Sequence, residues 1–199
     1  MGLISNGTTL LDAGALDSGV AKGALTHIKT ITASSDSTIN FVHGSSSVVL
    51  DNTYSEYIFK FINIHPSDGN MLTINGRDGG TDYDATKTST FVETYLNENG
   101  TNTPSVEHVD DYDLAQSTAA QRLAYIGNEN DESSSGYLHL YNPSSTTYVK
   151  HFISRFSCYH GSNLALDAFV QGYFNVTAAI DGIQFAMVSG NIDSGTIKL

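Results

Sequence analysis

Short segments of alternating apolar and polar residues recur along this chain, and clusters of turn-forming residues separate them about every 8–12 residues. Such alternation places one side of each segment on a buried face and the other toward solvent. We expect strands at 25–33, 38–42, 47–50, 56–64, 71–75, 86–96, 137–141, 148–159 and 168–176, with two more after residue 178. This pattern predicts an all-β protein, a jelly-roll-like two-sheet antiparallel β-sandwich.

The segment 178–199 carries the clearest strand–turn–strand pattern. Ile183, Phe185 and Met187 fall on one face of a pleated segment. The turn that follows contains Gly190, which adopts positive φ at little cost, and the chain then returns in alternation to residue 199. We therefore expect a terminal hairpin that closes a sheet and is held by neighbouring strands.

Two further elements are predicted from local pattern. Within 56–64 the aromatic side chains fall on one face and the three isoleucines share the other with Lys60, and two apolar faces predict a central strand covered on both sides. Pro66 ends this strand, since proline cannot donate to a ladder. One short helix is expected over 117–124, where Ser117 would cap the first turn.

The chain divides into two parts of different character. Residues 1–24 contain scattered Gly and Leu with no period of 2 or 3.6, which predicts an extended N-terminal arm that lies on its own domain or on a neighbouring subunit. Residues 25–199 have no internal linker and are expected to form a single β-sandwich domain. The hydrophobic content of 40% is adequate for one core.

The charge balance excludes several classes of partner. The formal net charge is −12, and no basic cluster stands out, so we expect no binding to nucleic acid and none to anionic membranes. No apolar run approaches the roughly 20 residues of a membrane-spanning helix. The first six residues lack a basic and an apolar region, so we expect no signal peptide.

Motifs for catalysis and cofactor binding are missing from the sequence. HExxH, GxSxG, GxGxxG and GxxxxGK[ST] do not occur, so we expect no enzyme, no catalytic residue and no organic cofactor. Asp110 and Asp111 leave a glycosidase open as an alternative, since that reaction uses two carboxyl groups. Cys158, the single cysteine, lies in an apolar run and is expected to be a packed core thiol.

Two further patterns indicate candidate binding residues. Asp78, Asp82 and Asp84 share a polar loop and are the candidates for calcium, the one possible cofactor; the alternative is a solvated acidic loop. Three tyrosines near loop edges could contact a glycan through a flat ring and a hydroxyl; the alternative is scattered surface tyrosines. These tyrosines are Tyr54, Tyr83 and Tyr112.

Seven short sequence stretches, spread along most of the chain, are similar to stretches of a known class of proteins. They are TITASS at 30–35, VVLDNTY at 48–54, IHPS at 64–67, TKTSTF at 86–91, GYLHLYNPSSTT at 136–147, VKHF at 149–152 and GNIDSGTIKL at 190–199. In their order the chain resembles small virion structural proteins of tailed phages, particularly marine ones, of the fibre or capsid-decoration type. The resemblance implies an assembled particle component without catalysis, and it transfers no functional residues, since such families are recognised by scaffold.

These observations predict a non-enzymatic virion structural protein, either a capsid decoration (cement) protein or a fibre component. We expect a homo-oligomer, a trimer above other states, that contacts capsid or tail subunits on the exterior of the virion after synthesis in the host cytoplasm. A glycan-binding receptor-recognition module at a tail fibre tip, with host surface glycan as its partner, is the alternative. A polysaccharide-cleaving enzyme and a cellular carbohydrate-binding module follow it.

Overall fold

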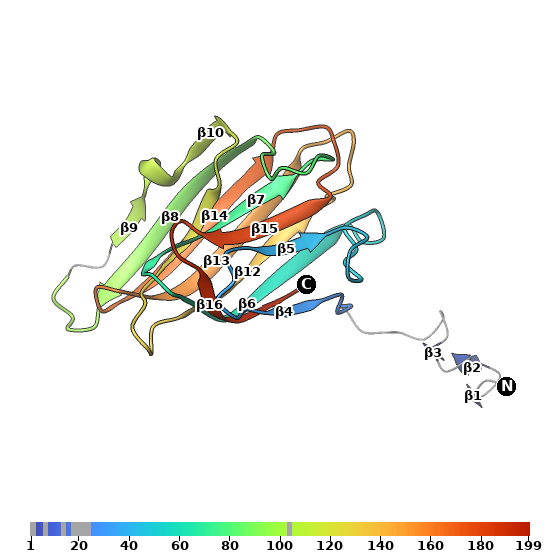
Figure 1. Cartoon of the computed structure of the whole chain (residues 1–199), viewed down its shortest axis with the longest axis horizontal. Coiled ribbons are helices and arrows are strands. Elements are labelled where there is room, and N and C mark those ends of the chain that lie inside the picture. The colour runs from blue at the N-terminus through green and yellow to red at the C-terminus, as the bar shows by residue number, and fades with distance from the viewer. Residues whose placement is uncertain (1–2, 6–7, 13–14, 17–24, 103–104) are drawn as a thin grey trace.

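The protein is all-β, with 55% strand and 2% helix. The structure, a computed structural model, describes residues 3–5, 8–12, 15–16, 25–102 and 105–199 (Figure 1). The larger sheet has nine strands in the order β10-β8-β14-β13-β12-β6-β16-β4, with β9 also paired to β8. Its strands are β4 (Thr30–Thr32), β6 (Glu56–Pro66), β8 (Lys87–Asn97), β9 (Ser105–His108), β10 (Leu114–Ser117), β12 (Ser134–Tyr141), β13 (Lys150–His160), β14 (Leu164–Phe174) and β16 (Ile192–Lys198).

The smaller sheet has four strands in the order β11-β7-β15-β5. Its strands are β5 (Ile39–Val42), β7 (Asn70–Arg77), β11 (Gln121–Ile126) and β15 (Gly182–Met187). Pairing is antiparallel in both sheets. Figure 1 shows β15 and β5 running in front of the larger sheet. The predicted two-sheet antiparallel β-sandwich is confirmed.

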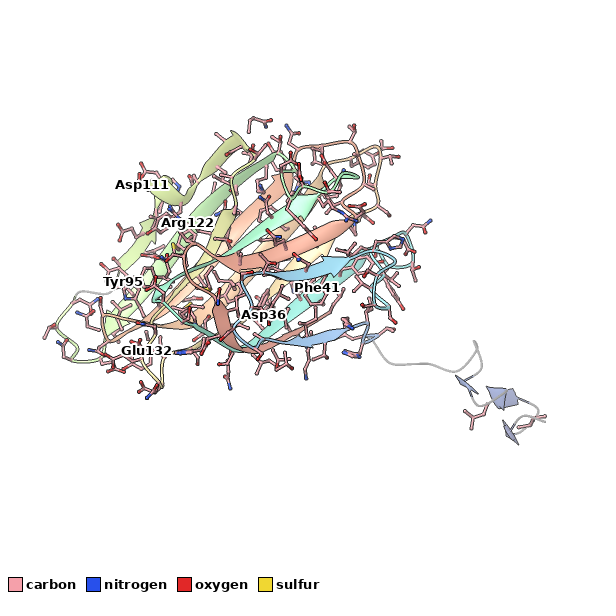
Figure 2. The ribbon with its side chains drawn as sticks, viewed as in Figure 1. Asp36, Phe41, Tyr95, Asp111, Arg122 and Glu132 are labelled. Carbon is pink, nitrogen blue, oxygen red and sulfur yellow. The ribbon has the colours of Figure 1, made fainter. Side chains whose placement is uncertain are left out.

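An aromatic cluster fills the space between the sheets. Phe41 of the smaller sheet, labelled in Figure 2, meets Phe59 edge-on at 5.2 Å between ring centroids. Phe185, also of the smaller sheet, meets Phe61 at 4.9 Å and 90°. All four rings are at most 2% exposed. Burying each such side chain contributes about 1.5–3 kcal/mol, and the edge-to-face geometry adds to this.

A bulge in β6 corrects the prediction that both faces of this strand are covered. Asn63 has a φ of +50°, and the pairing with β12 shifts register opposite it. The extra residue turns Ile64 into the core, where it is 0% exposed, while Ile62 on the opposite face is 41% exposed. The strand is central in its sheet, as predicted, but it is buried on one face only.

The terminal segment does not form the predicted hairpin. β15 pairs with β5 and β7 in the smaller sheet, whereas β16 pairs with β6 and β4 in the larger one. The turn between them therefore crosses from one sheet to the other. The last residue is held as expected, because the Leu199 N–H donates to the Lys29 carbonyl at 2.8 Å and the Leu199 carbonyl accepts from Ile28 and Lys29.

The predicted helix over 117–124 is wrong. The segment contains the end of β10, a turn and the start of β11. Ser117 accepts a hydrogen bond from the N–H of Ala119 at 3.1 Å, which stabilises a turn in place of a helical cap. Within the described ranges the one helix is the short 3₁₀ turn η1 (Asp110–Tyr112). The predicted strand at 47–50 is also absent, although Val48 and Leu50 are buried from a loop.

The N-terminal part forms a small sheet of its own. β1 (Leu3–Ser5), β2 (Thr8–Asp12) and β3 (Ala15–Leu16) pair with one another and with no strand of the sandwich, as far as the structure describes them. The predicted arm at 1–24 therefore includes paired strands; its residues 17–24 lie outside the described part. Its docking on a neighbouring subunit stays a prediction.

Candidate functional site

The larger sheet has one face turned toward the smaller sheet and one turned away from it. We call the face that is turned away the outer face. Along β12, β13 and β14 the inward residues are buried and most of the alternate residues are exposed or half-buried. No strand in the described ranges packs over these alternate residues. The outer face is therefore available to a ligand or to another subunit.

One row of residues crosses the middle of the outer face. The strand register places Val92, Phe169, Arg155, Tyr137 and Lys60 side by side on five neighbouring strands. Phe169 is 37% exposed and Tyr137 is 38% exposed, although both are large and partly or wholly apolar. We call this row the assembly belt.

Further apolar side chains on the outer face extend the belt toward one end of the sheet. Leu96 is 46% exposed and Val106 is 76% exposed. Val106 stands opposite Thr94 in the pairing of β9 with β8, so it projects from the same face. Thr94 and Asp167 lie between Phe169 and Leu96, so these apolar side chains alternate with polar ones. Several exposed apolar side chains on one face are a common feature of interaction sites.

Some of the charged groups of the outer face have side-chain partners. Arg155 Nη2 donates to Asp167 at 2.8 Å, and this hydrogen bond raises the pKa of the guanidinium. His139 Nδ1 contacts the carboxylate of Glu56. The His139 ring also stacks on Tyr141 at 6.1 Å between centroids. Arg155 and Glu56 therefore have side-chain partners on this face, whereas Lys60 and Lys198, which lie opposite each other, form no ion pair among the described residues.

The three predicted glycan tyrosines lie in separate places and are half-buried. Tyr54 packs edge-on against Tyr57 at 5.8 Å. Tyr112 packs against the core ring of Phe91 at 5.2 Å. Tyr83 lies beside the β7–β15 pair, and its burial raises the pKa of its hydroxyl. The structure therefore does not gather them into one platform, and their contact with glycan stays a prediction.

The acidic candidates are also spread out. In the part of the chain that the structure describes, no three His, Cys, Asp or Glu side chains lie close enough to hold a metal ion, so Asp78, Asp82 and Asp84 are not brought together. Asp111 lies in η1, where its carbonyl accepts from Arg122 at 3.3 Å, and Figure 2 shows the two residues near one another. The Arg122 guanidinium also lies 4.6 Å from the ring centroid of Tyr112.

Two lysines are fully buried inside the sandwich, which the sequence did not indicate. Lys87 Nζ donates to the carbonyls of Ala119 at 2.7 Å and Thr118 at 3.4 Å. Burial lowers the pKa of Lys87 to about 8. Lys150 Nζ donates to the carbonyl of Val176 at 2.6 Å, and burial also lowers its pKa. Both ammonium groups hold connecting loops and neither opens into a cleft with other titratable groups.

The single thiol is structural, as predicted. Cys158 is 4% exposed and its Sγ lies 3.3 Å from the Ser134 hydroxyl. Burial raises the pKa of the thiol to about 12, which leaves it protonated and unreactive at neutral pH.

The outer face escapes sequence reasoning because its residues do not form a sequence motif. Its strands carry tyrosine, histidine and phenylalanine at the alternate positions that face solvent in an ordinary sandwich. That departure from polar-out alternation is the available signal. Which strands lie side by side, and hence which side chains meet, depends on long-range pairing.

No family model, curated protein or solved structure matches the chain. Among the described residues no helix is long and apolar enough to cross a membrane.

Proposed function

We propose that this chain is a non-enzymatic structural subunit of a phage virion, a capsid decoration protein or a fibre component, that assembles through the belt of the outer face. The observation that carries the proposal is this belt, in which Phe169 and Tyr137 are exposed with Arg155 between them. Aromatic residues and arginine are the types enriched at the buried centres of protein interfaces. The virion assignment itself rests on the resemblance of the sequence to phage structural proteins.

A flat sheet face suits repeated contacts between copies. Complete burial of one phenylalanine side chain contributes about 1.5–3 kcal/mol, so a few such residues per subunit give a weak contact. Contacts repeated around a symmetry axis give avidity without a tight single site. A homotrimer on the exterior of the particle, in contact with capsid or tail subunits, fits this arrangement.

The N-terminal sheet supports the same proposal. β1, β2 and β3 pair only with one another among the described strands, and Ile4 is 60% exposed. Isolated sheets this short are marginal in water and gain stability by packing on a further surface. A neighbouring copy supplies such a surface, so the arm would link subunits in the particle.

The experiment is a belt substitution measured by association state. Phe169→Asp places a carboxylate at the middle of the belt, where burial against a second subunit costs several kcal/mol. We expect the full-length variant to sediment as a monomer at concentrations where the parent chain is oligomeric. Sedimentation velocity over a concentration series measures this.

Thr32→Asp is the matched control, because Thr32 is an exposed residue on the outer face of the edge strand β4, away from the belt. It should leave the association state unchanged. If Phe169→Asp is folded by circular dichroism and associates like the parent chain, the belt is not the assembly surface.

A further inference from the structure

Two shallow hollows adjoin on the outer face, beside the assembly belt. One has a volume of about 360 Å³ and lies over β8, β14 and β13. The other has a volume of about 500 Å³ and lies between the end of β12, the start of β13 and the loop that joins them. His151 lines both hollows, which adjoin at its side chain as the two parts of one site. We call it the His151 groove, and its main side chains are Thr90, Tyr141, Tyr148, His151, Gln171 and Tyr173.

The groove presents rings as its walls. The rings of His151 and Tyr173 meet at 5.8 Å between centroids and 65°. Tyr141 and Tyr148 line the second hollow together with His151, and Tyr148 is 75% exposed. Rings spaced in this way offer flat apolar planes to a ligand that has alternating C–H and hydroxyl faces.

The polar groups of the groove are available for binding. Within the described chain no hydrogen bond engages the side chains of Tyr148, His151 or Gln171, whereas His139 on the next strand is already paired with Glu56. The Tyr173 hydroxyl also makes no hydrogen bond within the described chain. A phenol, an imidazole and a carboxamide together supply both donors and acceptors along the rim.

The charge of the groove selects the ligand class. None of its six main side chains is Asp, Glu, Lys or Arg, and the chain as a whole carries a net charge of −12. An anionic ligand would therefore meet repulsion without a compensating cation. A neutral ligand meets no such electrostatic repulsion.

We propose that the His151 groove binds a neutral oligosaccharide, with sugar rings stacked on Tyr173 and Tyr148 and their hydroxyls bonded to Gln171 and His151. Two adjoining hollows accommodate more than one sugar unit. Gln171 follows Phe169 by two residues on β14, so the groove and the belt share no residue but occupy neighbouring rows of the same face.

The test is a binding titration of the full-length protein. Neutral hexasaccharides of glucose and of N-acetylglucosamine, and a wider glycan array that includes sialylated and sulfated sugars, serve as probes. We expect saturable binding to at least one neutral glycan by calorimetry. Tyr173→Ala and Tyr148→Ala should each weaken it about tenfold, which corresponds to about 1.4 kcal/mol.

Tyr137→Ala is the matched control, since Tyr137 is an exposed tyrosine of the same face that belongs to the belt. Tyr137→Ala should leave the glycan affinity unchanged and weaken self-association. Tyr148→Ala should lower the glycan affinity and leave self-association unchanged. The two measurements therefore test the groove and the belt separately. The inference is wrong if no neutral glycan binds at millimolar concentration, if only anionic glycans bind, or if Tyr137→Ala lowers the affinity as much as Tyr173→Ala does.

Discussion

Two lysines at one end of the core show how single residues close this sandwich. The register places Lys87 and Lys150 on either side of Phe174, and all three side chains are 0% exposed. Each ammonium group is satisfied by loop carbonyls and not by a carboxylate. The arrangement ties the loops at this end to the sheet, but it leaves positive charge in a poorly solvated place.

The buried charge of Lys87 gives a prediction for stability against pH. Its pKa is about 8 in the folded chain and 10.5 when unperturbed, so between these values the unfolded chain holds more protons than the folded one. The free energy of unfolding should therefore rise with pH across this window, by up to about 3 kcal/mol from this residue. Urea unfolding of the parent chain and of Lys87→Met at several pH values measures the difference.

Lys198→Met, which removes a lysine at an exposed position outside the belt, is the control. The prediction fails if the parent chain and Lys87→Met show parallel curves between about pH 8 and 10.5.

Among the strands, those with a clear local alternation of apolar and polar residues are predicted from the sequence. Strands that form because of their pairing with distant segments are missed. The patterns at 56–64, 86–96 and 148–159 correspond to β6, β8 and β13. The helix predicted over 117–124, with Ser117 as its cap, takes in the start of β11, whose residues 121–124 are good helix formers. Its pairing with β7 and the buried Gln121 amide, which donates to the Tyr112 carbonyl at 3.1 Å, override that propensity.

The prediction for the terminal segment fails for a related reason. A turn between two strands is compatible both with a hairpin and with a crossing between sheets, and local sequence does not distinguish the two. The candidate site has the same limit. Loop position favours Tyr54, Tyr83 and Tyr112, whereas the rings that meet on the outer face include His151 and Tyr173 of the neighbouring strands β13 and β14. Only the pairing of β12, β13 and β14 brings them to one face.

The contact between β16 and the bulge of β6 gives a prediction at this scale. Gly195 has a φ of +113°, and a Cβ there would lie 2.6 Å from the Asn63 carbonyl oxygen and 2.8 Å from the Ile64 Cα. Gly195→Ala must therefore separate two backbones as well as strain its own. We expect a loss of about 2–4 kcal/mol in the free energy of unfolding, measured in urea.

Gly44→Ala is the control, because Gly44 also has positive φ, at +77°, but a Cβ added there would meet no other atom within 4 Å. Its cost should be the backbone strain alone, about 1–2 kcal/mol. An equal loss of unfolding free energy in Gly195→Ala and Gly44→Ala would show that the backbones of β6 and β16 are not closely packed at Gly195.

At the scale of the whole molecule, the unequal sizes of the sheets explain where the surfaces for interaction lie. Nine strands face four, and the larger sheet keeps one whole face free of covering strands in the described chain. The assembly belt and the His151 groove both lie on that face. A single copy therefore leaves apolar and aromatic surface open to solvent, which is favourable only where another molecule covers it.

The measurement that tests the assembly claim most directly is the mass of the full-length protein in solution by sedimentation equilibrium. We expect a self-associating species, with a trimer of the 21.3 kDa chain as the closed form, and we expect Phe169→Asp to dissociate it. A mass of 21.3 kDa for the parent chain at every concentration, up to the highest that can be prepared, would contradict assembly through the belt.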